Sequence, residues 1–184
     1  MDKILHQKTV FDGHLTIQEA QFTNGRETYT RERVIRPGAA AVLVYNTDSQ
    51  KFILTRQFRY AISTEHPETI LEIVAGKLDG KEEPKAAAIR ECLEEIGYKI
   101  APENVHPIGS SFASPGYTSE LLHLFYAEVR QEDQLNAGGG LKEEQEEITV
   151  VEMERNDFLH KVKNMELQDA KSLIAGLWFI AHRL

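Results

Sequence analysis

The residues of this chain best suited to chemistry lie between positions 76 and 97, in the segment GKLDGKEEPKAAAIRECLEEIG. We expect a helix over most of it, because Pro84 suits a first helical turn and the glutamates before it suit the positive end of the helix dipole. Gly97 is typical of the residue that ends a helix. The helical spacing predicts one buried face made of Ile89, Cys92, Leu93 and Ile96.

Three carboxylates are expected on the opposite face of this helix. Glu91, Glu94 and Glu95 come together when each residue advances about 100° around the axis. Like charges on one face repel one another. A hard divalent cation such as Mg²⁺ removes that cost, because it prefers oxygen ligands. The alternative is a solvated acidic face that binds nothing, which is common for an isolated pair of glutamates.

The complete spacing of the segment, G-x5-E-x7-R-E-x2-E-E-x-G, is the signature of the Nudix hydrolases, and the chain closely resembles that family. The signature residues are Gly76, Glu82, Arg90, Glu91, Glu94, Glu95 and Gly97. We refer to residues 76–97 as the box. The resemblance implies that Mg²⁺, or alternatively Mn²⁺, is held by Glu91, Glu95, Glu94 and the carbonyl oxygen of Ala75.

The arginine of the box is expected to support catalysis by orienting other side chains, without acting directly on the substrate. By the same resemblance, Arg90 belongs to the catalytic set because it pairs with Glu82 or with the other box carboxylates and orients them. Glu72, just upstream of the box, is expected in the same polar shell.

One loop after the box resembles the corresponding loop of ADP-ribose pyrophosphatases and related nucleoside-diphosphate-sugar hydrolases. It is the segment SPGYTSE at residues 114–120. The resemblance implies substrate contacts from Ser114, Pro115, Gly116 and Glu120. The alternative is an ordinary Pro-Gly turn between two strands.

Two arginines are expected to reach the substrate, because guanidinium groups match the geometry of phosphate oxygens. The stretch RQFR at residues 56–59 is similar to those enzymes and implicates Arg59, whereas Arg56 is equally compatible with a solvated strand end. The segment TYTRERVIRPG resembles the one through which those enzymes reach the nucleotide, which implicates Arg31, with Arg33 and Arg36 as alternatives.

A glycine triplet followed by an acidic run suggests a mobile catalytic loop. The sequence AGGG at residues 137–140 precedes LKEEQEE at residues 141–147. In the resembling family, a loop with a glycine hinge carries a glutamate that acts as general base. We expect Glu144 to be this base and Glu146 its partner or an extra metal ligand, with Glu143 and Glu147 as alternatives.

The order of the elements predicts an α/β protein with a mixed sheet covered by helices on both sides. Expected strands occupy residues 4–23, 27–36, 39–45, 51–59, 68–75, 105–112, 121–129 and 148–153. Two helices should end the chain, one capped by Asn156 or Asp157 and the other beginning at Asp169. This order matches the Nudix α/β/α sandwich with an N-terminal β-hairpin extension. We expect residues 1–38 to form the extension and residues 39–184 the hydrolase domain.

The composition of the chain limits the classes of partner and the compartment that we expect for the protein. With 21 basic and 29 acidic residues, the net charge of −8 argues against non-specific nucleic-acid binding. No stretch approaches the roughly 20 apolar residues of a membrane span. The single cysteine, Cys92, excludes an intrachain disulfide and suits a cytoplasmic protein. The resembling enzymes pair through their N-terminal strands, so we also expect a homodimer.

Taken together, the resemblances imply metal-dependent hydrolysis of the diphosphate bond in nucleoside-diphosphate sugars of the ADP-ribose and GDP-mannose class. The products would be a nucleoside monophosphate and a sugar phosphate. Two alternatives remain: an enzyme that removes nucleoside triphosphates, and a nucleotide-sugar sensor that uses the same fold without turnover.

Overall fold

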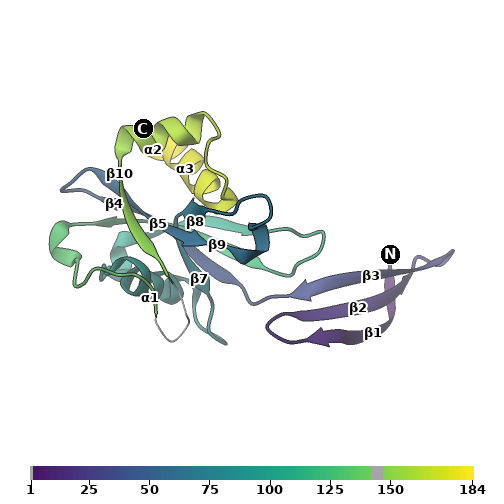
Figure 1. Ribbon diagram of the computed structural model, residues 1–184. Helices are drawn as coiled ribbons and strands as arrows, with labels where there is room; N and C mark the ends of the chain where they lie inside the picture. The colour runs from purple at the N-terminus through teal and green to yellow at the C-terminus, as the bar shows by residue number, and fades with distance from the viewer. Residues whose placement is uncertain (1, 142–146) are drawn as a thin grey trace.

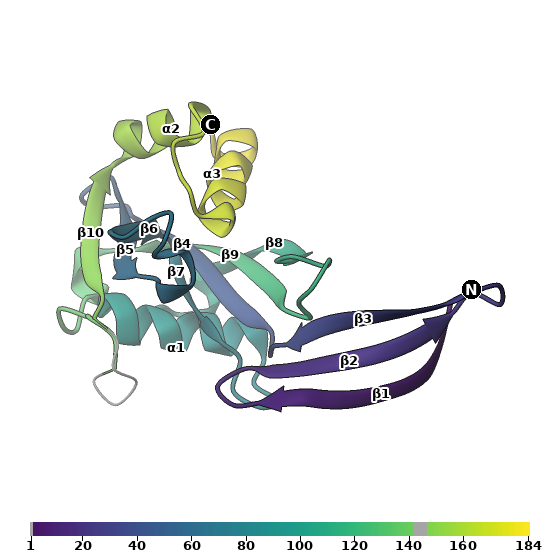
Figure 2. The ribbon, with the colours of Figure 1, turned by 45° about the vertical axis from the view of Figure 1, so that its right-hand side comes forward.

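A computed structural model describes residues 2–141 and 147–184 of the chain, and its first three strands form a separate sheet. Strands β1 (Lys3–Asp12), β2 (Thr16–Thr23) and β3 (Thr28–Ile35) pair in the antiparallel order β1-β2-β3. The sheet projects from one side of the molecule (Figures 1 and 2). The predicted hairpin turn at Asn24-Gly25 is confirmed, with Gly25 at a φ of 89°.

The prediction of one strand over residues 4–23 is wrong. The chain reverses at Gly13, whose N–H donates to the carbonyl of Leu15 at 3.1 Å. The pair Asp12-Gly13 is itself a hairpin-turn signal. The N-terminal extension is therefore three-stranded, with β1 added to the predicted hairpin.

The second sheet has seven strands and forms the centre of the molecule. They are β4 (Ala39–Asn46), β5 (Lys51–Phe58), β6 (Thr69–Glu72), β7 (Val74–Lys77), β8 (Val105–Phe112), β9 (Leu121–Val129) and β10 (Thr149–Glu154). The sheet follows the order β10-β5-β4-β9-β8, with β6 paired to β5 and β7 to β4. It is mixed, because β4 runs parallel to β9 and antiparallel to β5. The strand predicted over residues 68–75 divides in two, because its halves pair with different neighbours.

Helices cover both faces of this sheet, which confirms the predicted α/β/α sandwich. Helix α1 (Pro84–Ile96) packs on one face, and α2 (Arg155–Lys163) and α3 (Ala170–Arg183) pack on the other (Figure 2). Each face has its own apolar core, built around Val42 and Cys92 on the α1 side and Phe52 and Phe158 on the α2–α3 side. Three short 3₁₀ turns lie at Tyr60–Ile62, Pro102–Asn104 and Gln131–Asp133.

The helix ends follow local capping chemistry with one exception. Helix α1 begins at Pro84 and stops at Gly97, whose φ of 76° is left-handed. Asp169 caps α3 by accepting a hydrogen bond from the Ser172 N–H at 3.0 Å. The predicted cap of α2 at Asn156 or Asp157 is wrong, because β10 runs directly into the helix and Glu154 occupies the N-cap position.

The extension meets the body at the loop after β8. Strand β3 donates from the Val34 N–H to the Tyr117 carbonyl at 2.7 Å, and Val34 accepts from the Ser119 N–H at 3.1 Å. The N–H of Arg36 adds a bond to the Ser119 hydroxyl at 2.9 Å. These bonds place the predicted substrate loop beside the N-terminal segment, far from it in sequence.

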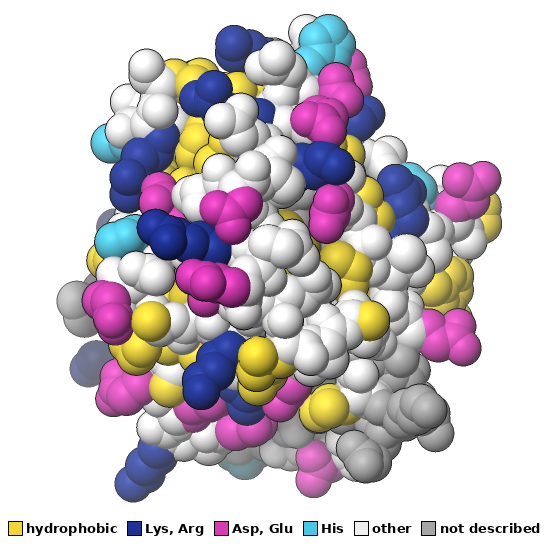
Figure 3. All heavy atoms as spheres, turned by 90° about the vertical axis from the view of Figure 1, so that its left-hand side faces the viewer, with side chains coloured by type: hydrophobic (Ala, Val, Ile, Leu, Met, Phe, Trp, Pro, Cys, Tyr) yellow, Lys and Arg dark blue, Asp and Glu magenta, His cyan; other side chains and the backbone are white. Residues whose placement is uncertain are grey.

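The surface charges are mixed in sign. On the face seen in Figure 3, Lys and Arg side chains alternate with Asp and Glu side chains. Among the residues that the structure describes, no helix is long and apolar enough to cross a membrane.

Candidate active site

Two of the box glutamates point toward the sheet. Glu91 is 8 % exposed and Glu95 is 3 % exposed, whereas Ile89 and Leu93 are only partly buried. The prediction that the carboxylates lie opposite the buried face is therefore wrong. Helix α1 buries a broader arc than the apolar pattern indicated, because β7 passes beside it with small residues that leave room for carboxylates.

The surroundings of Gly76 explain why the signature begins with a glycine. A Cβ atom at this position would overlap the carboxylate of Glu91. One residue earlier, the Ala75 N–H donates to Glu95 Oε2 at 3.2 Å. The end of β7 and the inner face of α1 thus bring backbone and carboxylate oxygens together.

Arg90 holds the acidic groups of the box. Its Nε and Nη2 donate to the two oxygens of Glu82 at 3.1 and 3.0 Å. Its Nη1 donates to Glu91 at 2.8 Å and to Glu94 at 2.9 Å. The hydrogen bond from Arg90 holds the pKa of the Glu82 carboxyl below its ordinary value, and the same contacts raise the pKa of Arg90. The guanidinium therefore stays charged and orients these carboxylates.

The donor atoms of the box fit a hard cation. Glu91, Glu94, Glu95 and the backbone of Ala75 offer only oxygen ligands, which Mg²⁺ and Mn²⁺ prefer and which are atypical of structural zinc sites. Within the described ranges, no three acidic, histidine or cysteine side chains are arranged to hold a metal ion together. Glu91 and Glu94 instead accept hydrogen bonds from Arg90.

A cavity of about 350 Å³ opens beside the start of the box. Ala75 and Gly76 form part of its wall, together with the predicted substrate residues Arg59 and Glu120. Four cations and three carboxylates line it, namely Arg36, Arg59, Lys77, Lys171, Glu72, Glu120 and Asp169. Residues from five separate parts of the chain thus meet in one cavity beside the box.

Lys171 was missed by the sequence reasoning. Its ammonium group donates to Glu72 at 2.5 Å and to Asp169 at 2.8 Å. Burial alone would lower the pKa of Lys171, but Asp169 and Glu72 raise it by more, so the side chain stays charged. A lysine in the first turn of a helix is unfavourable beside the positive dipole end, and such a local conflict is a signal of function.

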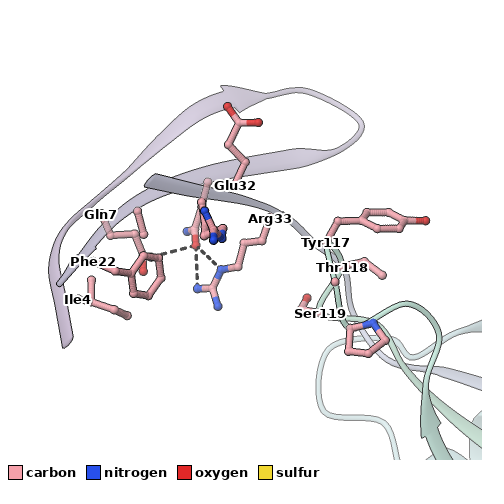
Figure 4. Close-up of a pocket in the computed structure, with 13 residues that line it drawn as sticks. Ile4, Gln7, Phe22, Glu32, Arg33, Tyr117, Thr118 and Ser119 are labelled. Atoms are coloured by element: carbon pink, nitrogen blue, oxygen red, sulfur yellow. Dashed lines mark hydrogen bonds between the residues drawn. The ribbon is translucent and has the colours of Figure 1, made fainter. Parts of the chain in front are cut away.

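A second cavity, of about 280 Å³, lies between the N-terminal sheet and the loop after β8. In Figure 4, Gln7, Phe22 and Arg33 lie on the sheet side, and Tyr117 belongs to the loop side. Predicted substrate residues Arg31, Pro115 and Gly116 line this cavity rather than the one beside the box. The structure therefore divides the predicted substrate residues between two neighbouring cavities.

Two further predicted residues have clear positions. The carbonyl of Ser114 accepts from the N–H groups of Tyr117 and Thr118 at 3.2 and 3.1 Å, so Ser114 shapes the loop. Arg56 is exposed on β5 and does not line the cavity that contains Arg59, which agrees with the alternative of a solvated strand end.

The glycine triplet before the acidic run is attached to the box helix. All three glycines, Gly138, Gly139 and Gly140, have positive φ angles. The N–H of Gly139 donates to the Glu95 carbonyl at 2.9 Å, and that of Gly140 to the Glu94 carbonyl at 3.1 Å. The predicted base Glu144, its partner Glu146 and the alternative Glu143 lie outside the described residues, whereas Glu147 is described and exposed.

Comparison with known proteins assigns this arrangement to a family. The NUDIX domain family matches residues 35–174, a range that contains the box, the cavity beside it and the start of α3. The chain belongs to the Nudix family. Members of this family generally require a divalent metal, which agrees with the oxygen donors of the box.

Individual Nudix relatives are similar over almost their full length. The chain is 35 % identical over 176 residues to GDP-mannose pyrophosphatase of Cronobacter sakazakii, covering 94 % of this chain and 89 % of the relative. It is 34 % identical over 181 residues to ADP-ribose pyrophosphatase of Bacillus subtilis, covering 95 % and 90 %. A crystal structure of an ADP compounds hydrolase shares the fold, with a TM-score of 0.76 at 20 % identity over 98 % of this chain and 92 % of that chain.

Proposed function

We propose that this Nudix enzyme hydrolyses the diphosphate bond of nucleoside-diphosphate sugars of the ADP-ribose and GDP-mannose class. The products are a nucleoside monophosphate and a sugar phosphate. The observation that carries the proposal is the cavity in which four cations lie beside the box residues Ala75 and Gly76. The two curated relatives, named for GDP-mannose and ADP-ribose, support this substrate class.

Mg²⁺ is the proposed metal, with Mn²⁺ as a substitute. Glu91, Glu94, Glu95 and the carbonyl oxygen of Ala75 would hold it. When bound, the metal neutralises charge on the diphosphate and lowers the pKa of a water ligand. Arg90 keeps the carboxylates in position through its bonds to Glu91 and Glu94.

Glu144 is the proposed general base. It would take the proton from the attacking water as the water approaches phosphorus in line with the leaving group. Glu146 is its proposed partner or an extra metal ligand. Glu143 and Glu147 remain alternatives for these roles.

The substrate is expected to use both cavities. Arg59 donates to the diphosphate, because a guanidinium offers parallel donors to phosphate oxygens. Glu120 accepts from sugar hydroxyl groups, and Arg31, Pro115 and Gly116 contact the nucleoside side. Ser114 supports the same loop through its carbonyl.

We further propose that the enzyme is a cytoplasmic homodimer that pairs through residues 1–38, with residues 39–184 as the hydrolase domain. Strand β1 is exposed along its whole length and includes Ile4, Leu5 and Phe11, each more than half exposed. A long exposed edge strand with apolar side chains is a natural place for another chain to pair. The mixed surface charge and the net charge of −8 support a small-molecule substrate rather than nucleic acid.

A substrate panel tests the proposal. ADP-ribose, GDP-mannose, UDP-glucose and a nucleoside triphosphate are incubated with the purified protein and Mg²⁺, and the products are separated and identified. We expect monophosphate and sugar phosphate from at least one diphosphate sugar. Binding of these compounds without any product would favour the sensor alternative. A triphosphate with a higher kcat/KM than every diphosphate sugar would overturn the substrate class.

A further inference from the structure

Three of the four cations that line the cavity beside the box pair with carboxylates. Arg59 Nε donates to Glu72 Oε2 at 2.8 Å, and Lys171 Nζ donates to Asp169 Oδ1 at 2.8 Å. A third pair joins an arginine of the N-terminal segment to the substrate loop, with Arg36 Nη2 at 3.4 Å from Glu120 Oε1. Three positive groups in this wall thus each have a carboxylate partner.

Glu72 has a special position among these carboxylates. Its side chain is 7 % exposed, and each of its oxygens bonds to a different cation, Oε1 to Lys171 and Oε2 to Arg59. Asp169 also caps α3, and Glu120 is more exposed at 21 %. Glu72 is therefore the carboxylate that most directly reduces the positive charge offered to a ligand.

A buried charge of this kind discriminates between ligands by their charge. Water and salt screen a buried carboxylate less than an exposed one, so its repulsion of an anion persists at physiological ionic strength. A nucleoside triphosphate brings more negative charge to the cavity than a diphosphate ester does. Each additional negative charge meets a cavity whose cations Arg59 and Lys171 are already partly neutralised.

We propose that Glu72 is a specificity-determining residue that limits the negative charge the cavity accepts, so that a diphosphate sugar is favoured over a triphosphate. This inference rests on the proposed function, since it concerns the substrate cavity of that same site. It predicts that the selectivity of the enzyme depends on the charge at position 72 and not only on the shape of the side chain.

The test compares Glu72→Gln with the wild-type enzyme. The measured quantity is the ratio of kcat/KM for the preferred diphosphate sugar to kcat/KM for the matching nucleoside triphosphate. Two unit charges about 10 Å apart at an effective dielectric constant of about 20 correspond to roughly a ten-fold effect. We expect the ratio to fall by about ten-fold, because loss of the carboxylate favours the more highly charged ligand.

Two matched variants separate the effect of the charge at position 72 from the structural effect of changing the side chain. Glu72→Asp keeps the charge but shortens the side chain, so both rates fall while their ratio stays close to the wild-type value. Glu152→Gln removes a carboxylate that pairs with Lys51 at 3.4 Å and lines a different hollow, so its ratio is unchanged. A merely structural role of Glu72 would lower both rates by the same factor in Glu72→Gln and leave the ratio intact.

A second assay measures ligand binding in the absence of turnover, so its result does not depend on catalysis. Dissociation constants for ADP-ribose and ATP are measured by calorimetry in EDTA, where we expect Glu72→Gln to strengthen ATP binding relative to ADP-ribose binding. If the wild-type enzyme cleaves no diphosphate sugar, the proposed function fails, while the binding ratio still decides the role of Glu72. An unchanged ratio in both assays, with a normal unfolding curve, would overturn the inference.

Discussion

Replacing Arg90 by glutamine should destabilise the protein in a way that depends on divalent metal. The guanidinium donates two hydrogen bonds to Glu82 and one each to Glu91, Glu94 and the carbonyl of Lys77. A hydrogen bond to a charged group contributes roughly 1.5–3 kcal/mol. The Arg90 side chain is 29 % exposed, so solvent screening reduces the total well below the sum of these bonds. We expect a loss of about 2 kcal/mol in the free energy of unfolding at neutral pH in EDTA.

Metal should offset much of this loss. Without Arg90, the carboxylates of Glu91 and Glu94 repel each other and the buried side chain of Glu95. A divalent cation that binds the same oxygens supplies the missing positive charge and stabilises the folded state by mass action. Urea unfolding with 10-fold steps in Mg²⁺ concentration should therefore show a stronger increase in stability for Arg90→Gln than for the wild-type protein.

The stability difference should also depend on pH. The pKa of Glu82 in the folded protein lies below its ordinary value of 4.5, because Arg90 donates a hydrogen bond to it. A carboxyl whose folded pKa is depressed contributes stability above its unfolded pKa and loses it as the pH falls through the folded pKa. The difference between wild-type and Arg90→Gln proteins should thus be full at neutral pH and shrink below about pH 4.5.

A matched arginine provides the control. Arg130→Gln removes a guanidinium that is 68 % exposed and lies 4.0 Å from Glu132, so it should change stability little and without dependence on metal. Equal losses for Arg90→Gln in EDTA and in saturating Mg²⁺ would refute the idea that this arginine and the metal stabilise the same carboxylates.

Three further predictions concern catalysis and assembly. Glu95→Gln should retain the fold and lower activity at least tens-fold, since even indirect changes at a metal site cost about 10–100-fold; near-normal turnover would contradict the metal assignment. Glu144→Gln should lower kcat roughly 10²–10⁴-fold with little change in substrate affinity, and a larger loss in Glu146→Gln would move the base to that residue. Phe11→Glu places a charge on exposed β1 and should shift the protein toward monomers in light scattering, whereas a wild-type protein that is monomeric and fully active at micromolar concentration would remove the dimer proposal.

Local chemistry determined much of what the sequence predicted correctly. Pro84 and Gly97 mark the ends of the box helix, and Asp169 marks the start of the last one, because caps and preset backbone angles act within a few residues. The fully buried stretch of β4 was equally clear, since a continuous apolar run at that length suits a central strand. Spacing within the box was also sufficient to place the chain in its family.

Elements that depend on distant partners were predicted less well. The segment 68–75 looks like one strand, yet it divides because β6 pairs with β5 and β7 with β4. The division of residues 4–23 into β1 and β2 was signalled locally by Asp12-Gly13, but the alternating pattern on either side concealed it. Neighbouring strands, which are non-local in sequence, decide the break between β6 and β7.

The sequence by itself determined which atoms are the candidates for the chemistry, because the box glutamates and their arginine lie within one short helix whose periodicity is local. Only the tertiary structure decided which way those glutamates face, since the close approach of Gly76 makes room for Glu91. It also brought Lys171 to Glu72 across 99 positions of sequence, a contact that no local pattern encodes. Packing of the last helix against the sheet creates that contact, and with it the charge balance of the cavity beside the box.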